Sequence, residues 1–411
     1  MRLLHLVLMA ALLLSPAPDV LGAEGFNVKD FGAVGDGNAD DTGAIQAALD
    51  KAKSGPRGAL VTLPPGEYRV TRPLCVENCL LTGLSAGGWP ADAGPMPTLR
   101  VDHTQGPCIV AKSAASVHGI NFAYDHKGEP ARKFGPAILL SGNGISITNV
   151  RIADPYEGIM ADGTSNIGRL NVENVFIISA RSCGVYVSNT YDIATLRNVE
   201  VWNPAPYCLQ HCTGFRLGKN DEIRLSNCFA FACKIGYHFV SDKDGPTWGG
   251  MTGCSADFSV EGIVIEAAES LRVTGGCMWA HATALRVNGP GRIAVSGVDL
   301  KSNGDAALIV RDCTSLTLTG CMLGKSGSNW PTVPAAKLEG GRSVLVNACT
   351  FDDNGPGIVI GEKMDVFSIT GNVFQPSPYA AITDNSAPTA AKVIADNISK
   401  KVDKKADRST Q

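Results

Sequence analysis

Apolar and polar residues alternate in short segments that recur along the chain from about residue 144. Each unit opens with apolar residues at alternate positions, passes through Asn or Gly to Val or Cys, and reaches a second strand after a polar turn. The first strands fall at 145–150, 170–175, 223–228, 271–277, 293–298, 316–321 and 344–349. The second strands begin near Gly158, Gly184, Gly214, Gly236, Gly262, Ala284, Ala307 and Gly357. This alternation predicts strands with one buried face and one wet face.

The units return mostly every 21 to 28 residues and show no helical periodicity. A unit this short cannot bury its apolar face alone. Stacking successive units buries that face and pairs their strands about 4.8 Å apart. The pattern therefore predicts an all-β solenoid of about a dozen coils. We expect it to occupy residues 24–387, followed by a C-terminal tail over 388–411.

The N-terminal end of this region has a different pattern. Residues 44–52 have high helix propensity, and a short helix here would cover the apolar side chains and strand edges of the first coil. We assign residues 24–58 to this cap. Asp36, Asp40 and Asp41 are expected to form turns and cap the helix, because they lack the regular alternation and final Glu of an EF-hand calcium loop.

Five of the thirteen cysteines occupy one position of the repeat, which valines occupy in other units. An inward-facing stack of small apolar side chains suits both residue types, so the pattern favours a ladder of buried thiols. Disulfides among the same five are the alternative, since exported proteins commonly form them. The five are Cys228, Cys254, Cys277, Cys321 and Cys349.

Residues 1–23 have the pattern of a signal peptide. Arg2 precedes an apolar run over 3–14, prolines interrupt that run, and a small-residue cleavage site ends at Ala23. The apolar run is too short to cross a bilayer. We therefore expect a secreted or periplasmic protein with no membrane insertion once the signal is removed.

The charge balance argues against one class of partner. The chain has 36 basic and 39 acidic residues and a net charge of −3, which offers no broad basic surface for nucleic acid. Hydrophobic residues make up 44% of the chain, enough for a folded core. The 46 glycines and the low aromatic content of 6% agree with many turns and short strands.

The opening of the predicted solenoid resembles a known family. Residues 26–48 read FNVKDFGAVGDGNADDTGAIQAA, and residues 63–68 read LPPGEY. This segment is similar to the pectate-lyase-3 group of the pectin-lyase-like superfamily, which includes rhamnogalacturonase- and epimerase-like proteins, relatives of glycoside hydrolase family 28 and phage tailspikes. The resemblance implies a single-stranded right-handed parallel β-helix and a carbohydrate ligand. It does not imply one reaction, because one fold supports several.

The catalytic signatures of family 28 are mostly missing. Gly-His-Gly and Arg-Ile-Lys are absent, and residues 188–192 are only a broken form of the Asn-Thr-Asp signature. Asp352 and Asp353 come too late in the chain to supply the Asp-Asp pair. A standard polygalacturonase mechanism is therefore not expected.

Two outward rows can be derived from the repeat. If the ladder position points inward, the residues one and three places later point outward. These rows place aromatic rings, which stack on sugars, beside carboxylates, which exchange protons. The candidate catalytic residues are Glu200, Asp257, Asp299, His281 and Lys301. The candidate substrate-binding residues are Trp202, Asn203, Phe229, Phe231, Trp248 and Arg151.

These residues support an exported enzyme that acts on an acidic polysaccharide as a lyase, hydrolase or epimerase. A lyase would need a base and a cation to neutralise the uronate, either Ca²⁺ or Arg. No other cofactor and no structural metal is indicated. The alternatives are a non-catalytic carbohydrate-binding or surface-structural β-helix and, less favoured, a tailspike-like adhesive module. The loops at 203–212 and 241–249 could wall a groove, or could instead cover the apolar rows.

Overall fold

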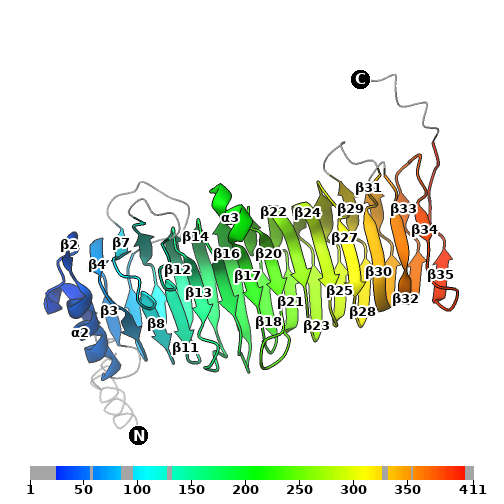
Figure 1. The fold of residues 1–411 in the computed structure, drawn as a ribbon. Helices are drawn as coiled ribbons and strands as arrows, with labels where there is room; N and C mark the ends of the chain where they lie inside the picture. Colours follow the sequence, from blue (N-terminus) through cyan, green and yellow to red (C-terminus); the bar gives the residue numbers. More distant parts are fainter. Residues whose placement is uncertain are drawn as a thin grey trace, which may run out of the picture.

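The computed structural model describes residues 25–55, 59–84, 96–126, 132–325, 332–352 and 355–402. The chain forms an all-β parallel solenoid of about 13 turns, drawn as a long rod in Figure 1. This confirms the predicted β-helix. Within the described part, helices are limited to a short 3-10 helix η1 (Val28–Phe31), α2 (Thr42–Lys53) and α3 (Pro206–His211).

Three parallel sheets, here named A, B and C in the order in which a coil visits them, run along the rod. Sheet A contains β1 (Gly25–Asn27), β3 (Leu60–Thr62), β6 (Leu80–Thr82), β9 (Ser116–His118), β12 (Ser146–Ala153), β14 (Asn171–Ile178), β16 (Ala194–Trp202), β18 (Ile223–Ser226), β21 (Trp248–Thr252), β23 (Ser270–Thr274), β25 (Arg292–Ser296), β28 (Ser315–Thr319), β30 (Ala336–Asn347), β32 (Ile358–Thr370) and β35 (Ala391–Ala395). Sheet B contains the second halves of β12, β14 and β16, with β2 (Asp36–Asp40), β4 (Gly66–Val70), β7 (Pro97–Val101), β10 (Asn121–Tyr124), β19 (Phe229–Phe231), β22 (Ser255–Ile265), β24 (Cys277–Asn288), β26 (Asp299–Ser302), β29 (Met322–Lys325), β31 (Thr350–Asp352) and β33 (Val373–Phe374). Sheet C contains the second halves of β22 and β24 and the first halves of β30 and β32, with β5 (Leu74–Val76), β8 (Ile109–Lys112), β11 (Ile138–Ser141), β13 (Glu157–Ala161), β15 (Cys183–Val187), β17 (Thr213–Leu217), β20 (Ile235–Phe239), β27 (Leu308–Asp312) and β34 (Ile382–Asp384).

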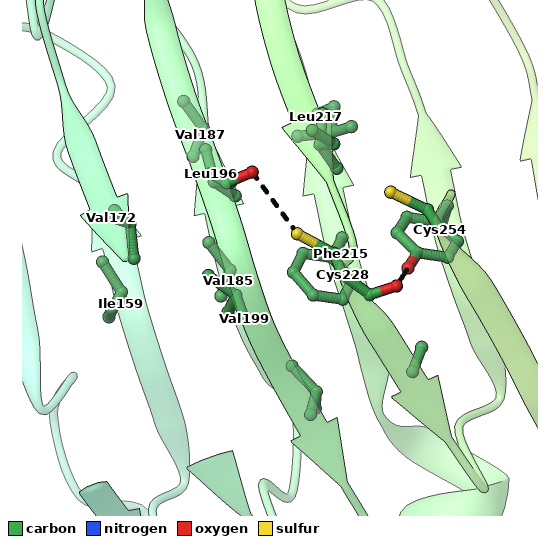
Figure 2. Packing of buried hydrophobic residues seen from close by; sticks show 14 of the residues in the cluster. Ile159, Val172, Val185, Val187, Leu196, Val199, Phe215, Leu217, Cys228 and Cys254 are labelled. Carbon is green, nitrogen blue, oxygen red and sulfur yellow. Dashed lines mark hydrogen bonds between the residues drawn. The ribbon is translucent and has the colours of Figure 1, made fainter. Parts of the chain in front are cut away.

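The core fills the interior of the rod because alternate side chains of every strand point inward. Figure 2 shows Val185, Val199 and Phe215 packed there, and all three are fully buried. Phe215 stacks on Tyr237 of the next coil with ring centroids 4.9 Å apart. The Tyr237 hydroxyl is buried and donates a hydrogen bond to the carbonyl oxygen of Cys228 at 2.8 Å.

The corner between sheets A and B is made by one residue in the left-handed conformation. Asn149, Asn174 and Asn198 have φ between 51° and 54°, a region that Asn tolerates better than most residues. Their side chains form a ladder, since Asn198 Nδ2 donates to Asn174 Oδ1 at 3.1 Å and Asn174 Nδ2 to Asn149 Oδ1 at 2.5 Å. Later coils mostly place glycine at this corner.

Four of the five predicted ladder cysteines are buried as free thiols, and none of the thirteen cysteines, all within the described residues, forms a disulfide. The four are Cys228, Cys254, Cys321 and Cys349. Cys277 is the exception and the prediction for it is wrong. Gly275 takes the left-handed corner and Gly276 takes the ladder position, so Cys277 pairs with Asp299 in the outward row of sheet B.

The predicted cap is present. Helix α2 covers the first coils with Ile45, Ala48 and Leu49 buried. Asp40 accepts a hydrogen bond from the Thr42 amide at 3.1 Å, and Asp41 accepts from the Gly35 amide at 3.0 Å. These carboxylates therefore accept hydrogen bonds from backbone amides, as expected for turns, but Asp41, at the N-cap of α2, makes no side-chain capping hydrogen bond.

The solenoid continues past residue 387, where we expected it to end, because β35 pairs in parallel with β32. The predicted signal peptide over 1–23 lies outside the described residues, as do the last residues of the predicted tail. In the described part, no helix is both long and apolar enough to cross a membrane.

Candidate functional site

The outward row of sheet B brings together several predicted ligand-binding side chains. Trp202, Phe231 and Phe258 stack on consecutive coils, with ring centroids 5.9 Å apart at each step and planes within 20° of parallel. Phe229 lies beside Phe231 at 6.3 Å. Most ring faces are therefore in contact with other rings. A sugar could reach the edges of Trp202 and Phe231, but not stack flat on both.

Phe258 ends this stack at the corner between sheets B and C. Its φ of 56° is uncommon for a bulky residue, and its side chain is 54% exposed. The ring of His281 meets it edge-on at 4.5 Å. Asp154, Ser179 and Ala232 adopt the same conformation at this corner in other coils, so the exposed ring, and not the backbone, distinguishes Phe258.

A hollow of ≈ 330 Å³ opens beside Phe258. Asp257, Trp279, His281 and Asn303 also line it. Trp279 was not predicted as a candidate, because the outward places of this coil were derived from Cys277 as the ladder residue. Gly276 takes that position instead, so the outward places fall one residue earlier, at Cys277 and Trp279. Met278 and Ala280 point inward, and Trp279, 42% exposed, takes the outward place beside Lys301.

Asp299 and Lys301 form an ion pair next to this hollow. Lys301 Nζ lies 3.1 Å from Asp299 Oδ2 and 4.9 Å from the centre of the Trp279 ring. The Cys277 thiol contacts Asp299 Oδ2 at 3.8 Å. Asp299 is therefore already in contact with a cation and a thiol, which leaves it less free to act on a substrate.

Glu200 and Arg151 belong to the same outward row but lie in earlier coils. The strand register aligns, on consecutive coils, the residues Arg151, Phe176, Glu200 and Phe229. Burial raises the pKa of the Glu200 carboxyl, which favours its protonated form. The hollow beside Phe258 does not include either residue.

Two predicted binding residues lie elsewhere. Asn203 is fully buried at the corner after β16, where its Nδ2 lies 3.2 Å from Cys233 Sγ, so it cannot contact a glycan. Trp248 begins β21 on sheet A, where its Nε1 donates to Asp221 Oδ1 at 3.2 Å. It is therefore separated from the aromatic row of sheet B.

The two predicted wall loops border sheet C, the first at its corner with sheet B and the second at its corner with sheet A. The first leaves the rod between β16 and β17 and carries α3, visible above the rod in Figure 1. The second joins β20 to β21, at the opposite corner of sheet C. Asp242 of this second loop accepts hydrogen bonds from the Ser188 hydroxyl and, at 2.8 Å, from the Lys219 amide. In these coils, a loop therefore projects from the rod at each of the two corners that bound sheet C.

Between the loops, sheet C presents three reactive side chains on consecutive coils. Tyr186, Arg216 and His238 are aligned by the pairing of β15, β17 and β20. The Arg216 guanidinium lies 5.0 Å from the centre of the Tyr186 ring. Neighbouring side chains in such a row are about 4.8 Å apart. This row was not predicted, because the outward positions were derived only for the first strand of each unit, although each of the three residues comes two places after a repeat glycine.

Acidic groups support the basic members of this row. His238 Nε2 lies 3.3 Å from Glu266 Oε2, within ion-pair distance but outside hydrogen-bond alignment. Arg286, two coils further along, forms an ion pair with Glu261. Glu157 lies near the Tyr186 end, and burial raises the pKa of its carboxyl. The face therefore combines a phenol, a guanidinium and an imidazole with no free carboxylate between them.

The described residues contain no group of three or more His, Cys, Asp or Glu side chains that could hold a metal ion. In the row between the two loops, the exposed guanidinium of Arg216 could neutralise a uronate carboxylate.

Comparisons with known proteins agree with this architecture. A family model described as "Rhamnogalacturonase A/epimerase, pectate lyase-like" matches residues 25–89. This confirms the resemblance seen in the opening segment. The mannuronan C5-epimerase AlgE3 of Azotobacter vinelandii is 65% identical over 46 residues, which cover 11% of this chain and 2% of that protein. The chain thus spans a very small part of this curated relative.

Two solved structures show the same fold. The A-module of mannuronan C-5 epimerase AlgE6 from Azotobacter vinelandii has a TM-score of 0.59 and 18% identity, covering 91% of this chain and 99% of that one. A tailspike of Escherichia coli bacteriophage HK620, in complex with a hexasaccharide, has a TM-score of 0.55 and 10% identity, with 89% and 78% covered. At these identities the likeness concerns the fold.

Proposed function

We propose that this is an exported protein that acts on an acidic polysaccharide, and that it removes a proton next to a uronate carboxylate, as a lyase or an epimerase does. The observation that carries the proposal is the row of Tyr186, Arg216 and His238 on sheet C, between the two loops. The epimerase names of the relatives agree with this chemistry, since mannuronan is a polymer of uronate residues.

Each member of the row has a chemical role. The Arg216 guanidinium binds the uronate carboxylate and stabilises the negative charge that builds on it when the adjacent carbon loses its proton. His238 takes that proton, with Glu266 stabilising the imidazolium that forms. Tyr186 donates a proton, either to the leaving oxygen in a lyase or to the opposite face of the sugar in an epimerase.

Hydrolysis fits this face less well. Glycoside hydrolysis generally needs two carboxyl groups, one on each side of the bond. On sheet C, Glu261 is paired with Arg286, and Glu266 lies against His238. The hollow on sheet B contributes only one carboxylate, Asp257.

The hollow on sheet B supports a second function, carbohydrate binding without catalysis. Trp279 and Phe258 are exposed rings at its walls, and ring stacking alone can hold a sugar. Asp257 and His281 also make it an alternative reaction site. The exported location of the protein, which rests on residues 1–23, is part of the same proposal.

The proposal is tested by incubating the secreted protein with polymannuronate, polyguluronate, polygalacturonate and a neutral glucan. Unsaturated ultraviolet-absorbing product indicates a lyase, and deuterium uptake from heavy water without cleavage indicates an epimerase. New reducing ends without unsaturation would indicate a hydrolase and contradict the mechanism.

Variants then locate the reaction. His238→Gln and Tyr186→Phe should lower kcat by at least 100-fold, and Arg216→Lys should raise KM as well. The matched control is Asp365→Asn, on an exposed position of a distant coil.

If Asp257→Asn or His281→Gln abolishes turnover while His238→Gln does not, the reaction belongs to sheet B. If a chelator abolishes turnover and Ca²⁺ restores it, Arg216 is not the sole neutralising group. If no product forms and only Trp279→Ala weakens glycan binding, the protein is a binder.

A further inference from the structure

Sheet A carries a cationic slot on a face of the rod not used by the proposed reaction. Thr195, Arg224, Gly250 and Arg272 follow one another in its outward row. Gly250 has no side chain, so the Arg272 side chain crosses this coil, with its Nε 3.8 Å from the Cβ position of Gly250, and reaches Glu222 beside Arg224. A hollow of ≈ 670 Å³ occupies this place.

The charges of this hollow are not balanced. Arg197, Arg224 and Arg272 line it together with a single carboxylate, Glu222. Glu222 Oε1 lies 3.2 Å from Arg272 Nη2 and 3.7 Å from Arg224 Nε. Because one carboxylate is shared by two guanidinium groups, N–H donors of both arginines remain available to bind another anion. Arg197 is paired outside the hollow with Glu173.

The backbone at Glu222 supports this arrangement. Its φ of 50° is uncommon for a residue other than glycine, asparagine or aspartate. The conformation holds the carboxylate between the two arginines, where it fixes both guanidinium groups. Ala114 and Arg169 adopt the same conformation at this corner in earlier coils, so the fold of the repeat itself sets the backbone at Glu222.

An adjoining hollow of ≈ 470 Å³ shares Glu222 and Arg224 and adds rings. Trp248 and Tyr191 line it, and Tyr191 is 50% exposed. The hydrogen bond from Trp248 Nε1 to Asp221 fixes the indole. Asp192 and Asp221 also line this hollow, but Asp192 is paired with Arg169 and Asp221 with Lys219. The combined groove therefore offers a platform for a sugar ring at one end and spaced cations at the other.

We propose that this groove is a second, non-catalytic binding site for an anionic polysaccharide, lying along sheet A from Trp248 to Arg272. Hydroxyl groups from Thr195, Ser226 and Thr252 beside the arginines suit a ligand that carries hydroxyls as well as charge. A nucleic acid would need a broad basic surface, which a chain of net charge −3 does not provide. The site goes beyond the proposed function, because it holds polymer and does not transform it.

The test uses calorimetric titration of the full secreted chain with oligomannuronate, oligogalacturonate and a neutral glucan of equal length. The double variant Arg224→Gln/Arg272→Gln removes the cations, and Gly250→Thr displaces the Arg272 side chain without changing charge. The control, Arg311→Gln/Arg342→Gln, removes the same charge elsewhere; Arg311 on β27 is paired with Glu339 on β30, and Arg342 is exposed. Thermal unfolding of each variant checks that it is folded.

We expect the first two variants to bind the uronate oligomers at least tenfold more weakly, and the control to stay within twofold of the parent. An equal loss in the control, unchanged affinity in both slot variants, or equal binding of the neutral glucan would overturn the site. Stronger binding of single-stranded DNA or polyphosphate than of the uronates would overturn the ligand class.

The outcome is separable from that of the proposed reaction. His238→Gln should leave binding at sheet A intact, and Arg224→Gln/Arg272→Gln should leave turnover of short oligosaccharides intact. Turnover without sheet A binding would sink only this inference. Sheet A binding without turnover would sink only the proposed reaction.

Discussion

Replacing Gly276 with alanine tests the register that decides what the sheet B site contains. Gly276 has φ of 89°, and a Cβ there would lie 1.9 Å from the Cys254 carbonyl oxygen. Gly297 occupies the left-handed corner one coil later, with φ of 62° and nothing within 4 Å of an added Cβ. Gly297→Ala is therefore a matched control with the same backbone demand and no collision.

The two changes share most of their free-energy terms. A non-glycine residue in the left-handed region costs about 1–2 kcal/mol, and removing a glycine from the unfolded chain returns about 0.4–1 kcal/mol. Only Gly276→Ala adds overlap with backbone, which costs about 1–3 kcal/mol in packed interiors. We expect Gly276→Ala to be less stable than Gly297→Ala by at least that overlap term.

The measurement is urea unfolding of both variants, followed by circular dichroism and by tryptophan fluorescence. If the chain escapes the overlap by slipping one residue, Trp279 would turn inward, and its emission would shift to shorter wavelength in Gly276→Ala alone. Equal midpoints and slopes for the two variants would refute the assignment of Gly276 to the ladder position.

Three further predictions concern the frame of the rod. Tyr237→Phe should lower the free energy of unfolding by about 1–2 kcal/mol, because the Ser255 carbonyl, 3.1 Å from the lost hydroxyl, would stay buried; a loss below about 0.3 kcal/mol would contradict this. Asn174→Ala should destabilise by about 1 kcal/mol more than Asn174→Gly, because glycine keeps the left-handed corner; thermal unfolding compares them, and equal melting temperatures would count against the corner argument. Burial opposes ionisation of Asp162, but hydrogen bonds from the Ser165 side chain and backbone outweigh it and lower its pKa to about 2, so Asp162→Asn should cost about 1–2 kcal/mol at neutral pH. That difference should fade as the pH falls from about 4 towards 2, and a cost independent of pH would exclude the ionic explanation.

The repeat made the fold and the buried ladder predictable, because an alternating strand can bury its apolar face only by stacking. The cap was predictable for the same reason, since residues 44–52 have the composition of a helix and no place in the repeat. The error at Cys277 arose because Cys suits both the ladder and the outward row. The corner glycine, Gly275, is the safer reference for counting.

The site was less predictable than the fold. The sequence shows that Trp202 and Phe231 share a face, but not that their rings stack on each other and cover their own surfaces. Trp248 could be placed only by knowing that its loop returns to sheet A. The Tyr186 row depends on the alignment of second strands, which loops of different length separate in the sequence.

The loop that carries α3 has a consequence for how such a protein can diversify. This loop is inserted between β16 and β17. The strands on both sides of it keep their register with the next coil, since Val201 is aligned with Ala230 in sheet B and Phe215 with Tyr237 in sheet C. Chain length can therefore change at a corner while the neighbouring coils keep their alignment. New walls and new specificities can be added there, one turn at a time, at little expense to the stacked interior.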